Sequence, residues 1–133
     1  MTTDKLIRLV LPWPPTSGNN QTRAGRGRVY TTDEIKTYRY IIWSMWMRDG
    51  KPVIEVPVSL SWYLSPPNLR EYDFENYSKV IKDAISAPRS KKAGVNGRAL
   101  YLLGDSNKHI PRESVVWGVP VKGGRAVVEV LPL

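Results

Sequence analysis

The sequence predicts a single α+β domain in which two main helices pack on one mixed β-sheet. Its 133 residues are enough for one domain. Segments of alternating hydrophobicity, typical of half-buried strands, are separated by two segments of helical periodicity. No internal repeat or interdomain linker interrupts the chain. The expected order of elements is β-α-β-α-β-β, with the helices covering one face of the sheet.

The first strand is expected at residues 5–11, where apolar side chains alternate with polar ones up to Pro12. Residues 16–30 follow and are expected to form a long basic loop, because they contain three glycines, three arginines and no acid. A loop of this length without regular structure is uncommon in a compact domain unless it has a function.

The first helix is expected to begin at a capping box formed by Thr31 and Glu34 and to end at Gly50. Its large apolar side chains recur at helical spacing, which favours a place in the core or at a dimer contact. Residues 53–64 alternate strictly and predict a half-buried strand. Pro57 indicates that part of this strand lies at the edge of the sheet.

The second helix is expected from about Asp73 to Ser86, with one apolar face and one polar face. Residues 87–104 are rich in Gly, Lys, Arg and Asn and are expected to form an exposed, mobile basic insertion. Residues 114–121 and 126–131, separated by a Lys-Gly-Gly-Arg turn, predict a terminal β-hairpin.

The charge balance favours a polyanionic partner. Twenty Lys and Arg against twelve Asp and Glu give a net charge of +8. This excess points first to nucleic acid and second to an anionic membrane, although a basic surface can also serve solubility alone. No apolar run approaches the roughly 18 residues of a membrane span. Without cysteine there is no disulfide or thiolate metal site. Together with the basic charge and the absence of a secretory signal pattern, this predicts a cytoplasmic protein that binds nucleic acid.

The polar face of the second helix gathers chemically useful side chains. At 100° per residue, Glu75, Asn76, Lys79 and Asp83 fall together, and Asp73 points the same way as Glu75 if the chain is still extended there. Carboxylates are the ligands that Mg²⁺ prefers, and a nearby lysine can neutralise transition-state charge. Taken alone, the pattern equally fits an ordinary amphipathic helix with a Glu–Lys pair four residues apart.

Four stretches, in order along nearly the whole chain, resemble the RusA-type Holliday-junction resolvases. They are residues 11–15 (LPWPP) with 19–20 (NN) and 26–28 (RGR), residues 73–79 (DFENYSK) with 83–84 (DA), residues 103–106 (LGDS), and residues 119–125 (VPVKGGR).

The resemblance implies that Asp73, Glu75 and Asp105 form a catalytic, metal-binding acidic cluster. It further implies that Lys79 is the catalytic lysine, with Asn76 as a positioning residue, and Asp83 as a supporting acid. Members of this family are Mg²⁺-dependent homodimers. For this chain we accordingly expect a homodimer that uses Mg²⁺, with Mn²⁺ as an alternative ion and no nucleotide cofactor. They bind four-way DNA junctions in recombination and repair and resolve them by paired, symmetrical nicks.

The chain departs from the family at two places. The family usually has Asp at the position of Glu75, and the stretch between Asp83 and Asp105 is longer here by a basic insertion. The expected DNA contacts lie in this insertion, in the basic loop as an arginine clamp on phosphates, and near the acids. They are Trp13, Asn20, Arg23, Arg26, Arg28, Arg70, Arg89, Lys91, Lys92 and Arg98.

Two alternatives to a junction resolvase remain at this stage. One is a non-catalytic DNA-binding protein on the same fold, its metal site blunted by Glu75. The other is a nuclease selective for flaps or forks. The single histidine, His109, cannot build a His-rich metal site, and a general-base role for it is not needed.

Overall fold

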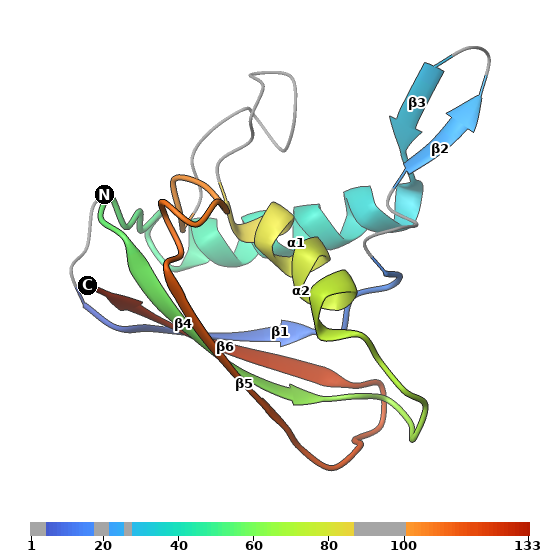
Figure 1. Ribbon diagram of the computed structural model, residues 1–133. Helices are drawn as coiled ribbons and strands as arrows, with labels where there is room; N and C mark the ends of the chain where they lie inside the picture. Colours follow the sequence, from blue (N-terminus) through green and yellow to red (C-terminus); the bar gives the residue numbers. More distant parts are fainter. Residues whose placement is uncertain (1–4, 18–21, 26–27, 87–100) are drawn as a thin grey trace.

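The computed structural model describes residues 5–17, 22–25, 28–86 and 101–133. Its elements in chain order are β1 (Ile7–Pro12), β2 (Thr22–Gly25), β3 (Arg28–Thr31), α1 (Asp33–Arg48), β4 (Val58–Ser65), α2 (Phe74–Ile85), β5 (Arg112–Trp117) and β6 (Arg125–Pro132). Both helices lie on one face of the main sheet (Figure 1). The predicted α+β class and the mixed sheet are thereby confirmed.

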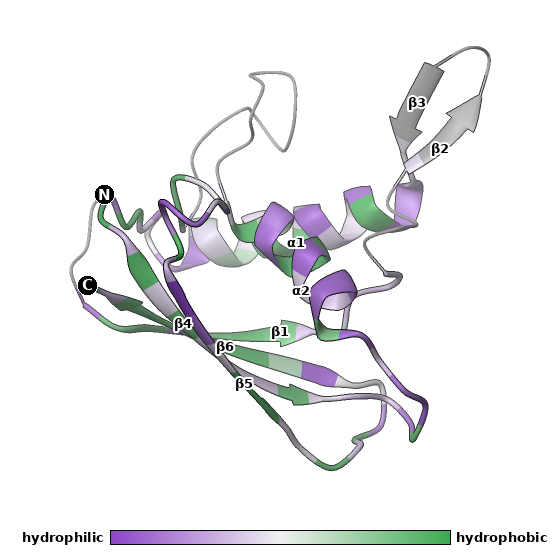
Figure 2. Cartoon of the chain, in the orientation of Figure 1, coloured by the Kyte–Doolittle hydropathy of each residue, from purple (hydrophilic) through white to green (hydrophobic). Residues whose placement is uncertain are grey.

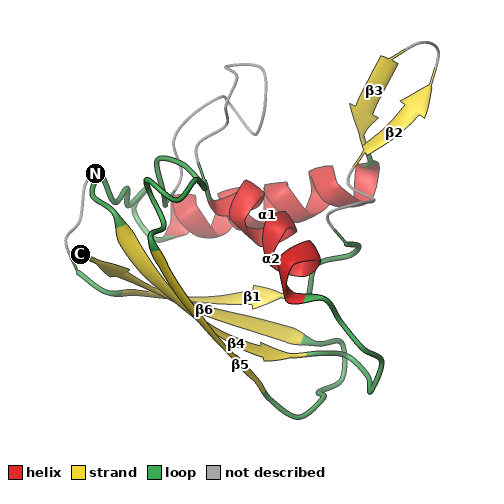
Figure 3. Ribbon diagram, viewed as in Figure 1, coloured by secondary structure: helices red, strands yellow, loops and turns green. Residues whose placement is uncertain are grey.

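The main sheet has four strands in the order β1-β6-β4-β5. β6 runs antiparallel to both β1 and β4, whereas β4 and β5 run parallel to each other. Figure 3 shows these strands crossing beneath the two helices. β4 therefore occupies an inner position, with a hydrogen-bonded neighbour on each side.

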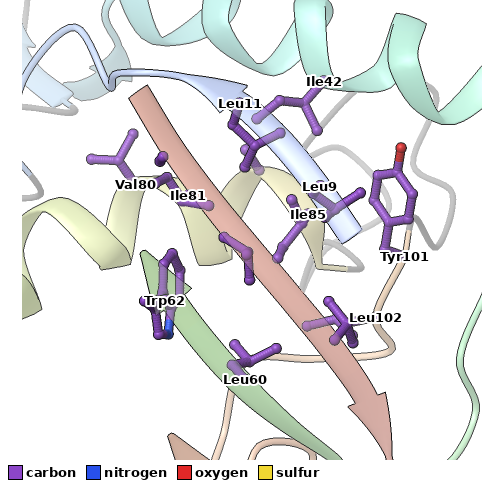
Figure 4. Packing of buried hydrophobic residues seen from close by; sticks show 14 of the residues in the cluster. Leu9, Leu11, Ile42, Leu60, Trp62, Val80, Ile81, Ile85, Tyr101 and Leu102 are labelled. Atoms are coloured by element: carbon purple, nitrogen blue, oxygen red, sulfur yellow. The ribbon is translucent and has the colours of Figure 1, made fainter. Parts of the chain in front are cut away.

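The core lies between the sheet and the helices. Alternate residues of each inner strand point into it, among them Leu60, Trp62 and Leu64 of β4, all 2% exposed or less. Ile42 of α1 and Ile81 of α2 belong to the same cluster and approach the sheet from the helix side (Figure 4). Full burial of one such aliphatic side chain contributes about 1.5–3 kcal/mol. Figure 2 shows hydrophilic residues on the side of α2 that faces away from the sheet.

The predicted edge position of Pro57 is wrong. β4 begins only at Val58 and is paired on both sides, so Pro57 stands just before the strand. There its carbonyl oxygen accepts a hydrogen bond of 2.9 Å from the backbone N–H of Leu133. A proline has no N–H to offer a ladder, and placing it one residue outside the strand removes that difficulty.

The predicted terminal hairpin is also wrong, because β4 lies between β5 and β6. Every residue of β5 is exposed when backbone and side chain are counted together, whereas Ala126, Val128 and Val130 of β6 are fully buried. The more apolar strand takes the inner position and β5 takes the edge. The turn at Gly123 and Gly124 therefore joins two strands that are not neighbours.

The segment expected to be a basic loop contains a two-stranded hairpin. β2 pairs antiparallel with β3, with Thr22 opposite Thr31 and Gly25 opposite Arg28. Only two residues separate the strands, a loop length that favours hairpins when glycine is present. Figure 1 shows this hairpin standing off from the main sheet at the start of α1. Because Thr31 belongs to β3, Thr32 caps α1 instead, without a side-chain hydrogen bond.

The predicted insertion at 87–104 is only partly exposed, since Tyr101 and Leu102 are buried at 0% and 1%. The Tyr101 hydroxyl donates to an Asp49 carboxylate oxygen at 3.0 Å, and burial, followed by this hydrogen bond, raises the pKa of the phenol. The backbone N–H of Leu102 donates to the Ile85 carbonyl. Residues 87–100 lie outside the described residues.

In the described part of the chain, no helix combines the length and the apolar character needed to cross a membrane.

Gly124 allows the turn after β5 to close against Trp13. A Cβ at Gly124 would lie 2.7 Å from Trp13 and 3.0 Å from Pro67, whereas a Cβ at Gly123 would meet nothing within 4 Å. Both glycines have positive φ, +77° and +73°.

We expect Gly123→Ala to lower the free energy of unfolding by about 1–2 kcal/mol through backbone strain alone, and Gly124→Ala to lower it further by overlap with Trp13. Urea denaturation of both variants measures the difference, and equal losses would contradict the tight packing of Trp13.

Candidate active site

A pocket of about 300 Å³ lies beside the first half of α2. It is lined by Phe74, Glu75, Ser78, Lys79, Lys82, Asp105 and Glu113. These residues come from α2, from the turn after the insertion and from the start of β5. Three of the four predicted catalytic residues, Glu75, Lys79 and Asp105, thus share one pocket although 30 residues separate the first from the last.

The orientation of α2 follows from its apolar face. Val80, Ile81, Ala84 and Ile85 are buried against the sheet. This burial fixes the rotation of the helix about its axis. Residues 75, 79 and 82 then form one stripe at spacings of four and three, which turns toward the pocket.

Glu75 and Lys79 do not form the helix-surface ion pair that an ordinary amphipathic helix would favour. Both side chains are exposed and line the pocket. Within the described residues, neither of them makes an ion pair. Both charges face the pocket, and no ion pair within the described residues joins them.

Asp73 has a structural role at the start of α2. Its carboxylate accepts hydrogen bonds from the backbone N–H groups of Glu75 at 2.9 Å and Asn76 at 3.3 Å. This is the N-cap arrangement that satisfies the unpaired donors of a helix start. Asp73 is exposed and does not line the pocket. Asn76 and Asp83 are half-buried and do not line it either.

Glu113 and Lys82 were missed from the sequence. The Trp62 indole N–H donates to one carboxylate oxygen of Glu113 at 2.8 Å, and the Lys82 ammonium group donates to the other at 2.6 Å. The side chains of Lys82 and Glu113 are only 19% and 26% exposed. Glu113 is therefore held at both oxygens.

The sequence contains a local pattern that could have identified Lys82, but none that could have identified Glu113. Lys82 follows Lys79 by three positions and so lies on the same helical stripe. Glu113 reaches the pocket because β5 pairs in parallel with β4, which sets it beside Leu60 and next to Trp62. Nothing in the sequence around Glu113 indicates that pairing.

Asp105 lies in a tightly bonded turn. The backbone N–H groups of His109 and Ile110 both donate to the Ser106 carbonyl, and the His109 carbonyl accepts from Val58 at the start of β4. The His109 ring lies 3.1 Å from the Ser106 hydroxyl and packs on Gly104, where a Cβ would come within 2.7 Å of it. His109 is thus part of the turn that carries Asp105, and it is not a lining residue of the pocket.

The donors in the pocket fit Mg²⁺ in kind. Glu75 and Asp105 supply carboxylate oxygens, and Mg²⁺ is usually held by one or two carboxylates with water and substrate phosphate. In residues 5–17, 22–25, 28–86 and 101–133, no three Asp, Glu or His side chains are gathered as a group that could hold a metal ion. Asp73, Glu75 and Asp105 are therefore not assembled as such a triad in this structure.

The predicted DNA contacts are distributed over several surfaces. Trp13 is half-buried among aromatic rings, and the exposed Arg70 guanidinium lies 5.6 Å from the centre of the Tyr72 ring. Arg23 and Arg28 lie on β2 and β3. The remaining predicted contacts lie outside the described residues: Asn20, Arg26, Arg89, Lys91, Lys92 and Arg98.

No family model matches the chain, and no curated protein is significantly similar to it.

The double hydrogen bond of Glu113 gives a stability prediction. Glu113→Ala leaves the buried Trp62 N–H without its acceptor, which costs about 1–3 kcal/mol. Glu113→Gln keeps an amide oxygen for Trp62 and loses both the charge and the acceptor that face Lys82, which lies closer to solvent. We therefore expect a smaller loss. Urea denaturation compares the two variants with the unaltered protein. If the Ala variant were as stable as the Gln variant, the bond to Trp62 would not matter for stability.

Proposed function

We propose that this protein is a Mg²⁺-dependent endonuclease that cuts branched DNA, of the kind represented by the RusA-type Holliday-junction resolvases. Its substrate is the four-way junction, and a homodimer introduces one nick with each protomer. The proposal combines the resemblance in sequence with the pocket beside α2.

The observation that carries the proposal is the convergence of Glu75, Lys79 and Asp105 on one pocket. The resemblance in sequence implies catalytic roles for these same three residues. Two of them belong to α2, and the third comes from a turn beyond the basic insertion. A merely amphipathic helix gives no reason for an acid from a distant turn to face the same pocket.

The composition of the pocket suits phosphodiester hydrolysis. Glu75 and Asp105 would hold the Mg²⁺ ion, which when bound polarises the scissile phosphate and lowers the pKa of the attacking water. Lys79 and Lys82 place two ammonium groups at the same pocket, where they favour the negative charge that develops on the phosphate. Glu113 holds Lys82 in place. Hydrolysis forms one P–O bond from water and breaks one P–O bond to the sugar.

The basic charge supports the choice of DNA as substrate. With a net charge of +8, the chain is expected to neutralise several phosphates and to bind nucleic acid in a strongly salt-dependent way. Arg70 is exposed in the loop before α2, three residues ahead of Asp73, and its guanidinium lies over the Tyr72 ring.

The first test compares carboxylate variants on a labelled four-way junction in saturating Mg²⁺. We expect Glu75→Gln and Asp105→Asn to lower the single-turnover nicking rate by at least about a hundredfold, because neutral amides bind Mg²⁺ poorly and each 1.4 kcal/mol costs about tenfold. Glu75→Asp, which restores the residue usual in the family, should retain activity.

The matched control for these variants is Glu55→Gln, at an exposed acid on the loop before β4 and outside the pocket. It should nick at the unaltered rate. A Glu75→Gln protein that cuts as fast as the unaltered chain would remove Glu75 from the active site. Tight junction binding without nicking by the unaltered chain would favour the non-catalytic alternative, and nicking of flaps or forks alone would favour the other nuclease.

Asp73 needs a separate test because it caps α2. Asparagine is about as good an N-cap as aspartate, whereas alanine costs about 1 kcal/mol. We therefore expect Asp73→Asn to leave the free energy of unfolding nearly unchanged. Because the resemblance in sequence also assigns Asp73 a metal-binding role, we expect the same variant to lose nicking while junction binding persists. Parallel denaturation, gel-shift and nicking measurements separate the two roles. Normal nicking by the Asn variant would leave Asp73 with the capping role alone.

A further inference from the structure

A cluster of four aromatic side chains lies at one end of the sheet, beside the start of α2. Trp13, which follows β1, is at its centre. The ring centre of Trp13 lies 5.2 Å from that of Tyr72, 5.7 Å from that of Tyr77 and 6.5 Å from that of Trp117 at the end of β5. Tyr72 and Tyr77 also meet edge to face at 5.0 Å. We call these four residues the aromatic cluster.

The aromatic cluster is open to solvent, in contrast to the core. Trp117 is 41% exposed, and Trp13, Tyr72 and Tyr77 are half-buried. Two loops border the aromatic cluster, residues 66–72 and residues 118–124, joined by a hydrogen bond from the Val121 N–H to the Pro66 carbonyl. Each loop exposes an aliphatic side chain, Leu69 at 91% and Val119 at 77%. Apolar side chains that lie together at the surface in this way are typical of an interaction site.

Cationic side chains accompany the exposed rings. The Arg70 guanidinium lies over the Tyr72 ring at 5.6 Å from its centre. Lys122 and Arg125 are exposed on the turn that packs on Trp13 through Gly124. Flat rings that offer π faces, bordered by groups that attract phosphate, are the combination by which proteins bind unpaired nucleotides. The exposed Glu71 is the one acid on the two bordering loops, so cations outnumber acids around the rings.

The aromatic cluster and the pocket share the start of α2. Asp73, the N-cap, stands between Tyr72 of the aromatic cluster and Phe74, which lines the pocket. A strand whose phosphate enters the pocket therefore passes close to the exposed rings. In a perfectly stacked duplex the bases cannot reach such rings, but at a branch point bases can leave the stack.

We propose that the aromatic cluster binds an unpaired nucleobase of a DNA strand by stacking on Trp117, with Arg70 holding the adjoining phosphate. The inference rests on the proposed DNA substrate and adds to it that unpaired bases next to the cut are recognised. Stacking is tolerant of base identity, because every base has a π face. The rings therefore select unpaired DNA over duplex DNA and do not select a particular base.

The test measures binding in EDTA, where no cutting occurs, by fluorescence anisotropy of a labelled oligo-dT and of a blunt duplex of equal length. We expect Trp117→Ala to weaken oligo-dT binding by about tenfold, in the range measured for loss of one stacking ring, and to change duplex binding by less than about twofold. Trp117→Leu, which keeps apolar bulk without a π face, should weaken oligo-dT binding similarly, while Trp117→Phe should retain most of it.

Tyr40→Ala is the matched control, because Tyr40 is 58% exposed on α1 and stacks on Trp43 outside the aromatic cluster. It should bind both DNAs as the unaltered chain does. The proposal is overturned if Trp117→Leu leaves oligo-dT binding unchanged, if oligo-dT and duplex lose affinity equally, or if Trp117→Leu changes only the oligomeric state in sedimentation, which would assign the rings to a protein contact.

A junction-nicking assay in Mg²⁺ separates this proposal from the proposed function. Selective, Trp117-dependent oligo-dT binding without nicking supports the aromatic cluster and rejects the nuclease. Nicking with no effect of Trp117 on oligo-dT binding supports the nuclease and rejects the aromatic cluster.

Discussion

The burial of Trp62 in β4 is the constraint on which both the core and the site depend. Its ring is fully buried and meets Phe74 of α2 edge to face at 5.5 Å. An indole buried in this way still needs a partner for its N–H. The parallel strand β5 supplies that partner in Glu113, whose second oxygen binds Lys82 of α2. The Glu113 side chain thus connects the inner strand β4, the edge strand β5 and the helix α2 around the pocket.

The same arrangement explains why the site lies at the first half of α2. The helix presses its apolar face on the sheet and begins at the Asp73 cap, so the angular position of every later side chain is fixed. The turn that carries Asp105 is tied to β4 through the bond between Val58 and the His109 carbonyl. Helix and turn are therefore positioned independently by the same strand, and their side chains meet in the pocket.

The sequence predicted what depends on local periodicity. The alternation in β1 and β4, the helical spacing of both helices and the stripe formed by Glu75 and Lys79 all concern neighbours in the chain. The choice of strand partners depends on distant residues instead, so the inner position of β6, the parallel pairing of β5 and the role of Glu113 were missed. The hairpin of β2 and β3 was missed because its glycines and arginines are equally typical of a loop.

The two lysines of the pocket differ in their contacts, and this difference bears on the proposed function. Lys82 is held by Glu113, so its charge is partly balanced and its position is fixed. Lys79 is exposed, and within the described residues neither it nor Glu75 has an ion-pair partner. A pair of that kind on a helix surface would contribute about 0.2–0.5 kcal/mol. The fold does not use this gain and leaves the charges of Glu75 and Lys79 facing the pocket. The proposed Mg²⁺ ion and DNA phosphate would match these two charges.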